Sequence, residues 1–298
     1  MKTWKSWILF PIEILGFLGM YVFFRVLPLR VSQQIAMRIG WLLSKIHPAS
    51  RIIECNLHLT QFPTNNRAQF VSEVWGHCAA LLAEYAHTHS YSKLIHTHLH
   101  VKGHEHLEAF NNSLRAGIFA GAHIGNWGLA GAYIHAHART KVAMVHRPPN
   151  NWVLNTCVHY IQAPFADVIV EKNIYAGQKL VRLLNDNVSI FMLIDQKNNA
   201  GISLPFLKRE AKATPGAALL TYKHNRPILP FMCQRNTDGT FTLTFSPVIW
   251  PHDFSNTPEP VRAITQKLNN LCEQWIRQAP TQWLWLHKRF HRSLYRPK

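Results

Sequence analysis

Acidic side chains are scarce in this sequence. Asp and Glu number 15 against 32 Lys and Arg, a net charge of +17, which favours a polyanionic partner such as nucleic acid, phospholipid headgroups or an acidic protein. Charged residues of both signs make up only 16% of the chain, below the quarter that is usual for soluble domains. Because 47% of the residues are apolar, this shortage of charge predicts a folded chain with a sizeable core and not a disordered one.

Paired cysteines are missing as well. The five cysteines are scattered, odd in number and never spaced as C-x-x-C, which argues against a disulfide framework or a zinc ribbon and favours reduced thiols facing the cytosol. We also find no internal repeat, low-complexity tract or linker. The sequence therefore predicts two parts, an N-terminal segment at 1–30 and a single domain at 31–298.

Charge is nearly absent from residues 6–24, where Glu13 is the only charged side chain. A helix of this length spans about 28 Å, close to the hydrocarbon thickness of a bilayer. Pro11 and Glu13 count against a clean span, so a helix lying in the membrane interface is a second interpretation. A buried core helix is the third, and no small-x-small site that would mark a cleaved signal peptide follows. Both membrane interpretations make residues 1–30 an anchor.

The periodicity of the remaining chain changes along its length. Apolar residues recur at helical spacing over 29–46, 51–59 and 70–87. From residue 118 onward, short apolar runs typical of buried strands alternate with helical segments, up to a closing helix at 258–278. This alternation predicts an α/β domain with a mixed, mostly parallel sheet flanked by helices.

Histidine is abundant, with 19 copies, and three of them alternate with apolar residues over 95–101. This pattern predicts a half-buried strand whose outer face carries His96, His98 and His100. Such a face could bind a metal ion, but no carboxylate or cysteine other than Glu105 is in register with it, so we favour a solvated or headgroup-facing strand. We expect no metal.

The most informative stretch is G-A-H-I-G-N-W at 121–127. It places His123 where a predicted strand, 118–122, ends and a predicted helix, 127–137, begins. Ligands of open α/β sheets bind beyond the carboxyl ends of the strands, and the amide groups at a helix N-terminus bind oxyanions. His123 is therefore a candidate general base, with an ordinary turn histidine as the alternative.

Polar residues follow two more predicted strands. Arg147 comes after strand 141–145 and could bind a phosphate with both arms of its guanidinium. Asp195 comes after strand 188–193 and could orient a substrate hydroxyl or the imidazole of His123. The alternatives are a surface arginine in a loop and an aspartate that caps a helix or a turn.

Aromatic residues and cations are interleaved near the C-terminus, in Q-W-L-W-L-H-K-R-F at 282–290. This composition suits a membrane interface or a lipid headgroup. It would also suit single-stranded nucleic acid, whose bases stack on aromatic rings.

These four stretches, in this order and spacing, resemble the lipid A biosynthesis lauroyl and myristoyl acyltransferases, a family of the lysophospholipid acyltransferase superfamily. The family shows a G-x-H-x-G-N-W-E block, a Y-R-P block, a D-Q block and a closing P-x-Q-W/Y-L-W-x-H-x-R-F. Residues 280–290 match the closing block almost letter for letter. The likeness extends from the N-terminal segment to Phe290 and includes Arg51, Asn56 and Glu84.

The resemblance implies transfer of a fatty acyl chain from acyl carrier protein to a hydroxyl of a lipid A precursor, in lipopolysaccharide biosynthesis. His123 would accept the proton of that hydroxyl, with Asn126 and Asp195 as further catalytic residues. The phosphorylated glycolipid would be bound by Arg147, Asn150, Gln196 and Lys197. Such chemistry requires no metal or organic cofactor. The enzyme would lie at the cell inner membrane, with its catalytic domain facing the cytoplasm.

The sequence departs from the family at a position that matters for catalysis. The family pairs its histidine with an acid five residues on, where this chain has Gly128. In a Ser-His-Asp triad, replacing the acid by its amide lowers the rate about 10⁴-fold. Asp195, Glu84 or Asn126 could substitute for the missing acid. Otherwise the enzyme is slow, or the chain is a non-catalytic relative that binds lipid.

A second departure lies at residues 159–163, where the family usually carries an arginine. The motifs do not fix the acceptor, so a lysophospholipid or a glycosylated phosphoinositide is the alternative to a lipid A precursor. We do not expect nucleic acid as a partner, because the apolar N-terminal segment favours a membrane.

Overall fold

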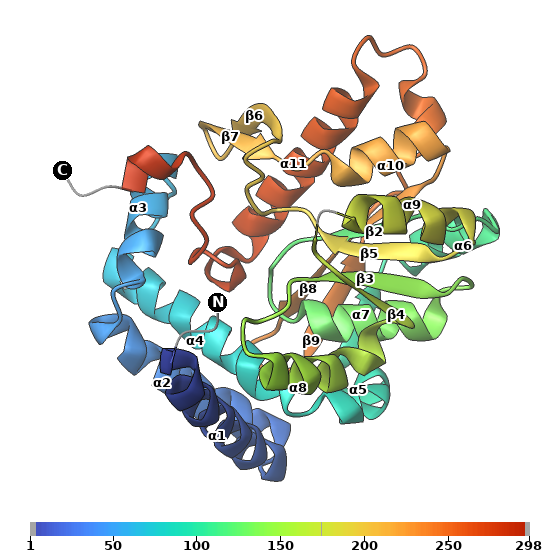
Figure 1. The fold of residues 1–298 in the computed structure, drawn as a ribbon. Coiled ribbons are helices and arrows are strands. Elements are labelled where there is room, and N and C mark those ends of the chain that lie inside the picture. The colour runs from blue at the N-terminus through green and yellow to red at the C-terminus, as the bar shows by residue number, and fades with distance from the viewer. Residues whose placement is uncertain (1–3, 174, 296–298) are drawn as a thin grey trace.

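A seven-stranded sheet forms the centre of the protein in the computed structural model, which describes residues 4–173 and 175–295, with side chains from residue 10 onward. The strand order is β1-β9-β8-β2-β5-β3-β4, and every neighbouring pair is parallel except β8 and β9. The predicted α/β class with a mixed, mostly parallel sheet is confirmed (Figure 1). Two further strands, β6 and β7, form a separate antiparallel ribbon. The strands are β1 (Leu99–Lys102), β2 (Ile118–Gly121), β3 (Val142–His146), β4 (Val168–Glu171), β5 (Ser189–Leu193), β6 (Ile202–Phe206), β7 (Arg209–Ala213), β8 (Ile228–Arg235) and β9 (Phe241–Phe245).

Helices cover both faces of this sheet (Figure 1). Helices α7 and α8 lie on one face and α9 and α10 on the other, and a cluster of buried apolar side chains fills the space on each side. A strand covered on both faces reads as a continuous apolar run, which is why Ile118, Phe119 and Ala120 of β2 are all buried. The helices are α1 (Trp4–Val26), α2 (Leu29–Ile46), α3 (Ser50–Thr60), α4 (Arg67–Tyr85), α5 (Tyr91–Thr97), α6 (His104–Asn112), α7 (Trp127–His137), α8 (Trp152–Gln162), α9 (Ala176–Asn185), α10 (Gly216–His224) and α11 (Pro260–Gln278).

Three adjacent strands of the sheet end at the same edge. Strand β5 lies between β2 and β3, all three are parallel, and the last residue of β2, Gly121, pairs with the last residue of β5, Leu193. Because the strands end side by side, the segments that follow them are brought together although they are some 70 residues apart in sequence. The polar residues predicted to act in the site, His123, Arg147 and Asp195, all follow strands that end at this edge.

The strand predicted over 95–101 is wrong in its first half. Residues up to Thr97 belong to helix α5, and only β1 is extended. The apolar side chains that the helix buries, Tyr91, Leu94 and Ile95, are three and four residues apart, so a helical period was present beside the alternation. Within the described residues, no three His, Cys, Asp or Glu side chains are grouped so that they could hold a metal ion.

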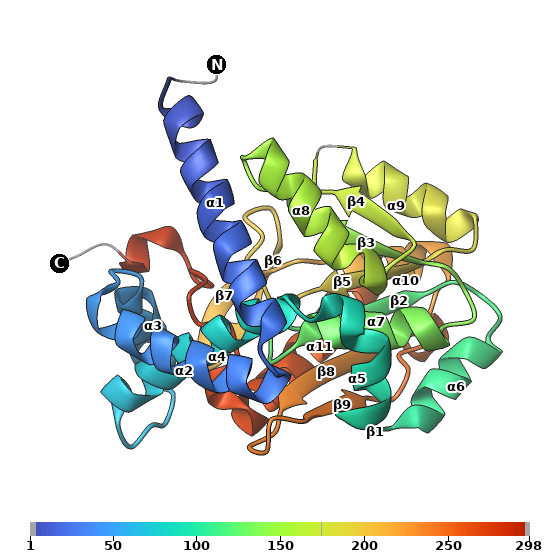
Figure 2. The same cartoon turned by 90° about the horizontal axis from the view of Figure 1, so that it is seen from below.

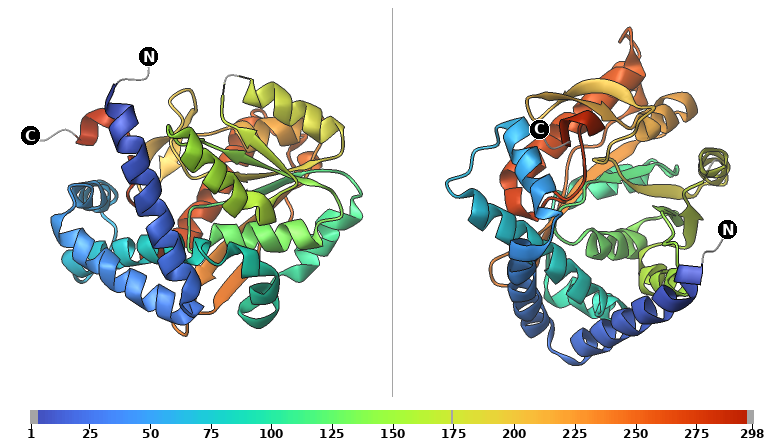
Figure 3. Two further views of the ribbon diagram at one scale, coloured as in Figure 1. Left: turned by 60° about the horizontal axis from the view of Figure 1, so that its bottom comes forward. Right: turned by 60° about the vertical axis from the view of Figure 1, so that its left-hand side comes forward.

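The apolar N-terminal segment forms α1, which packs against α4 and α8 along the outside of the molecule, with α2 following at Pro28 (Figures 2 and 3). The apolar residues of α1 are not confined to one face of the helix, whereas a surface helix of a soluble protein has one polar face. In the part of the chain that the structure describes, no helix combines the length and the apolar character needed to cross a bilayer.

Candidate active site

His123 and Asp195 meet at the edge where β2 and β5 end. His123 lies two residues beyond β2, and Asp195 lies two residues beyond β5. The Nδ1 atom of His123 is 2.7 Å from Oδ1 of Asp195, and the other carboxylate oxygen accepts a hydrogen bond from the backbone N–H of His123 at 3.1 Å. The pairing follows directly from the parallel register of the two strands.

Asp195 is held as a carboxylate by its neighbours. Its side chain is buried, and Oδ2 also accepts a hydrogen bond of 2.7 Å from the indole N–H of Trp283. Burial alone would raise the pKa of Asp195, but the adjacent His123 and the hydrogen bonds from His123 and Trp283 outweigh it and lower the pKa to about 2. A buried anion therefore faces the imidazole at neutral pH.

The hydrogen bonds around His123 assign its tautomer. A carboxylate can only accept, so Nδ1 of His123 carries the proton that it donates to Asp195. In the neutral ring the other nitrogen, Nε2, carries no proton, and it lies 3.3 Å from the side-chain amide nitrogen of Gln196. The imidazole has 16% of its side-chain surface exposed, so Nε2 is a proton acceptor within reach of a substrate.

Asn126 lies close to His123 in sequence but has another role in the fold. It caps the N-terminus of α7, where its side-chain oxygen accepts the backbone N–H of Leu129 at 2.8 Å. Its amide nitrogen donates to Oε2 of Glu84 at 2.9 Å and to the hydroxyl of Tyr91 at 3.0 Å. These bonds direct the amide into the core, so Asn126 positions the start of α7 and is not the partner of the imidazole.

Glu84, another candidate for the missing acid, is also committed elsewhere. Arg235 binds it with two nitrogens, at 2.6 Å and 2.8 Å, and both side chains are buried. Gln33 adds a hydrogen bond of 2.9 Å to Oε1 of Glu84. Of the three candidates that the sequence offered, the structure brings only Asp195 to His123.

A side chain at position 128 would require the rings of Phe165 and Tyr85 to shift. A Cβ atom at Gly128 would lie 2.8 Å from Cζ of Phe165 and 2.8 Å from Cε1 of Tyr85, well inside the distance at which carbon atoms touch. The two aromatic rings are 6.0 Å apart and fill the space beside the first turn of α7. The rings of Tyr85 and Phe165 therefore occupy the space beside Gly128, where the family motif has an acid.

The loop that carries His123 is clamped on two sides. Gly125 has a φ of +56° and contacts the carbonyl of Cys233, so only glycine fits there. The N–H of Gly125 donates to the carbonyl of Gln282 at 3.2 Å, and the N–H of Leu284 donates to the carbonyl of His123 at 3.0 Å. The closing C-terminal block therefore fixes the position of the histidine.

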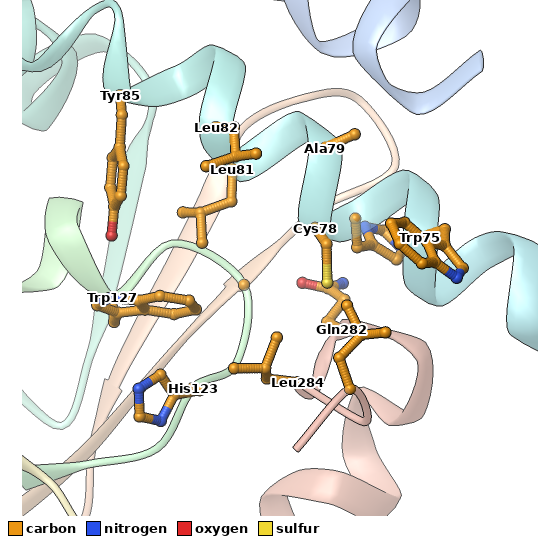
Figure 4. A pocket seen from close by; sticks show the side chains of 13 residues that line it. Trp75, Cys78, Ala79, Leu81, Leu82, Tyr85, His123, Trp127, Gln282 and Leu284 are labelled. Atoms are coloured by element: carbon orange, nitrogen blue, oxygen red, sulfur yellow. The ribbon is translucent and has the colours of Figure 1, made fainter. Parts of the chain in front are cut away.

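A cavity of about 320 Å³ opens beside His123 (Figure 4). Figure 4 shows His123, Trp127 and Tyr85 at one end and Trp75 and Cys78 at the other. One wall is α4, and the opposite wall is the 282–286 segment. Most of the lining is apolar, so the cavity suits a hydrocarbon group whose polar end lies at the imidazole. Its lining residues are Trp75, His77, Cys78, Ala79, Leu81, Leu82, Tyr85, His123, Gly125, Trp127, Gln282, Leu284 and Leu286.

The predicted substrate-binding residues fall into two groups. Gln196 and Lys197 directly follow Asp195, and Gln196 contacts the imidazole. Arg147 and Asn150 are exposed in the loop after β3, one strand further along the same sheet edge, and do not line the cavity.

The C-terminal block is not a membrane-facing surface. Trp283, Trp285, Arg289 and Phe290 are almost completely buried. Arg289 donates to the carbonyl of Lys212 at 2.8 Å and lies 4.5 Å from the centre of the Phe206 ring. The interpretation of this block as a headgroup or nucleic-acid surface is therefore wrong. The block supports the loop and the carboxylate of the site, and its 282–286 segment forms one wall of the cavity.

Sequence reasoning missed two features of the site. The bond from Trp283 to Asp195 joins residues 88 positions apart, and no local pattern announces it. The rings of Tyr85 and Phe165 around Gly128 come from two other elements, and only the small size of residue 128 hinted that its surroundings were full.

Comparison with known proteins gives one match. Residues 1–292 match the family model described as bacterial lipid A biosynthesis acyltransferase. None of the curated proteins matches the chain. The family match covers nearly the whole sequence and includes every element that builds the site. The chain therefore belongs to the bacterial lipid A biosynthesis acyltransferase family.

Proposed function

We propose that the protein transfers a fatty acyl chain from acyl carrier protein to a hydroxyl of a phosphorylated lipid A precursor, with His123 as general base and Asp195 as its acid partner. The observation that carries this proposal is the His123–Asp195 pair, 2.7 Å apart, at one end of an apolar cavity. Family membership supports the acyl transfer, and the site supports the division of roles.

The proton moves through Nε2 of His123. This nitrogen accepts the proton of the acceptor hydroxyl while the hydroxyl oxygen attacks the thioester carbonyl carbon. The imidazolium that forms is stabilised by the buried carboxylate of Asp195 through Nδ1. When the carbon–sulfur bond breaks, the leaving thiolate takes the proton back from Nε2. The neutral imidazole is restored, and the products are an ester and a thiol.

The surroundings of His123 support both the chain and the developing charge. The acyl chain of the donor would lie in the apolar cavity between α4 and the 282–286 segment. The oxyanion of the tetrahedral intermediate would form beside the N-terminus of α7, where the first amide groups carry partial positive charge.

Cations at the same sheet edge favour an anionic acceptor. Arg147 is exposed after β3, and Lys197 follows the Asp195–Gln196 pair after β5. We assign Arg147, Asn150, Gln196 and Lys197 to the polar and phosphorylated part of the glycolipid. The net charge of +17 favours both this acceptor and an acidic carrier protein.

We infer that the protein works at the cytoplasmic face of the inner membrane and that residues 1–30 attach it there. The support is the apolar character of α1 on all sides together with the excess of cations in the chain. Attachment within the interface, without crossing, fits a helix that packs against α4 and α8 along its side.

The test is acyl transfer from labelled acyl carrier protein to a tetra-acylated lipid A precursor in detergent micelles. Wild type should transfer the label, and His123→Ala should lower the rate by a factor of about 10³ or more. A wild-type rate in His123→Ala would refute the general base. A wild type that is silent here but transfers to a lysophospholipid would correct the acceptor and leave the mechanism in place.

A further inference from the structure

Helix α2 has the reverse of the polarity expected for a surface helix. The side chains that it buries completely are small or polar, while six of its large apolar side chains are exposed. The buried residues are Ser32, Gln33, Ala36, Gly40 and Ser44. The exposed apolar residues are Val31, Ile39, Trp41, Leu42, Leu43 and Ile46, which are 36% to 79% exposed.

Small residues let α2 approach α4 closely. A Cβ at Gly40 would lie 2.6 Å from the carbonyl carbon of Trp75, and one at Gly76 would lie 3.3 Å from the carbonyl oxygen of Met37. The hydroxyls of Ser44 and Ser72 share a hydrogen bond of 2.9 Å across the interface. Close approach through Gly and Ser, with polar side chains bonded between the helices, is the packing used by helices whose outer surface meets hydrocarbon.

Helix α1, which precedes α2, also exposes large apolar side chains. Its exposed residues include Ile12, Leu15, Val22 and Val26, the last of them 74% exposed. Figure 2 shows α1 and α2 lengthwise on the near side of the molecule, and Figure 3 shows them joined at one corner. We call these outward surfaces of the two helices the α1–α2 face. Exposed large apolar residues gathered on two consecutive helices are unusual on a soluble protein and indicate a binding surface.

The charges on α2 are all of one sign. Arg30, Arg38 and Lys45 are exposed, and the helix contains no acidic residue. The ammonium group of Lys45 lies 3.7 Å from the centre of the Trp41 ring, so an aromatic ring and a cation stand together beside the apolar residues. Tryptophan with lysine is typical of the boundary between hydrocarbon and anionic headgroups.

We propose that the α1–α2 face is a docking surface for an anionic lipid bilayer, with α2 lying in the interface and its apolar side chains among the acyl chains. The proposal rests on the membrane location proposed above. It adds to the membrane contact α2, most of which lies beyond the attachment segment at residues 1–30. A second copy of this chain is the other possible occupant. Two such faces would bring Arg38 and Lys45 of both copies together, whereas anionic headgroups neutralise them.

Substitution on α2 tests the docking surface in the full chain. Wild type, Leu42→Glu and Ile39→Glu would be mixed with vesicles of phosphatidylglycerol and phosphatidylethanolamine in equal parts, and the bound fraction measured by flotation. Each substitution should weaken binding by about tenfold or more, because it removes an apolar side chain from hydrocarbon and adds a negative charge. The matched control is Leu114→Glu, at a residue that is 71% exposed and lies outside α1 and α2, and it should bind as wild type does.

A second measurement locates α2 directly. Lipids brominated in their acyl chains quench tryptophans that reach the hydrocarbon, and Trp41→Phe should lose a measurable part of the quenching seen in wild type. Equal flotation of wild type and the α2 variants, with equal quenching of Trp41→Phe, would overturn the proposal while acyl transfer in micelles stays intact. A lipid-free dimer that Leu42→Glu converts to a monomer would identify a second copy as the occupant and overturn it as well.

Discussion

The two sides of the His123 loop differ in polarity, because one carries a buried carboxylate and the other carries aromatic rings. On one side, Asp195 and the indole N–H of Trp283 form a buried polar pair that contacts the imidazole. On the other side, at the position where the family carries an acid, Gly128 is closed in by the rings of Tyr85 and Phe165. The comparison shows that a histidine at the start of a helix can take its carboxylate partner from the neighbouring strand when its own helix offers none.

Parallel strands make this exchange possible. The ends of β2 and β5 are adjacent, so a residue two positions past either strand reaches the same point. The family's acid would approach His123 from the first turn of α7, whereas Asp195 approaches from the strand side. The absence of an acid at position 128 therefore does not leave the imidazole without a carboxylate.

The largest effect should follow from restoring the family motif. Gly128→Glu places five extra heavy atoms, three of them a carboxylate, against Tyr85 and Phe165, and we expect it to destabilise the fold by more than about 4 kcal/mol and to abolish transfer. Thermal unfolding and the transfer assay would measure both. Gly177→Glu, at an open position on α9 with no atom within 4 Å, is the control and should change neither.

A double variant sharpens this prediction. If crowding is the cause, Tyr85→Ala should recover part of the stability lost in Gly128→Glu, and the two changes should not be additive. A gain of activity in Gly128→Glu alone would show that the site still needs an acid on α7 and that Asp195 does not replace it.

Removing the buried partner of Arg235 should have the next largest effect. Glu84→Gln leaves the guanidinium buried without its carboxylate and weakens the hold on Asn126, and we expect a loss of about 3 to 5 kcal/mol in the free energy of unfolding. Urea unfolding gives this value. The comparison variant is Glu73→Gln on the outside of the same helix, for which we expect less than about 1 kcal/mol. Equal losses would mean that the buried pair contributes nothing specific.

The lowered pKa of Asp195 predicts how stability changes in acid. Its pKa is about 2 in the folded protein against an ordinary 3.8, so the folded state prefers the carboxylate. The resulting stabilisation, about 2 kcal/mol, is present above about pH 4 and is lost as the pH falls toward 2. Urea unfolding of wild type and Asp195→Asn over this range should converge as the pH falls. Parallel curves would show that the carboxylate is not stabilised in the fold.

The smallest effect concerns the indole that supports Asp195. Trp283→Phe removes one hydrogen bond to the carboxylate, and we expect kcat to fall by about tenfold with little change in KM. Trp285→Phe is a close control, because its indole is equally buried but donates to the carbonyl of Pro280. Similar losses of kcat in both variants would assign the effect to packing alone.

The sequence predicted the sheet and the place of the site because both depend on local periodicity. Apolar runs that alternate with helical segments mark parallel strands, and polar residues just past the strands, His123 and Asp195, meet as the topology requires. The helix predicted at 127–137 is α7 to the residue. Local sequence pattern was enough to predict the helices and strands whose boundaries depend on their own residues.

The sequence failed where distant residues decide. Residues 282–290 look like a surface of aromatics and cations, yet Trp283, Trp285, Arg289 and Phe290 are buried. Asn56 of α3 donates to the carbonyl of Trp285 at 2.7 Å. Asn126 looked catalytic because it follows His123, but Glu84 draws its amide away. Composition does not show which distant residues will cover a side chain or form hydrogen bonds with it.

The most direct test of the account is the rate of acyl transfer by Asp195→Asn. The amide keeps the shape of the side chain but removes the charge that stabilises the imidazolium, so kcat should fall by about 10⁴-fold while KM and the fold are retained. Thermal unfolding at neutral pH would confirm that the variant is folded. A folded Asp195→Asn with the wild-type rate would contradict the account, because His123 would then act without the carboxylate that the sheet brings to it.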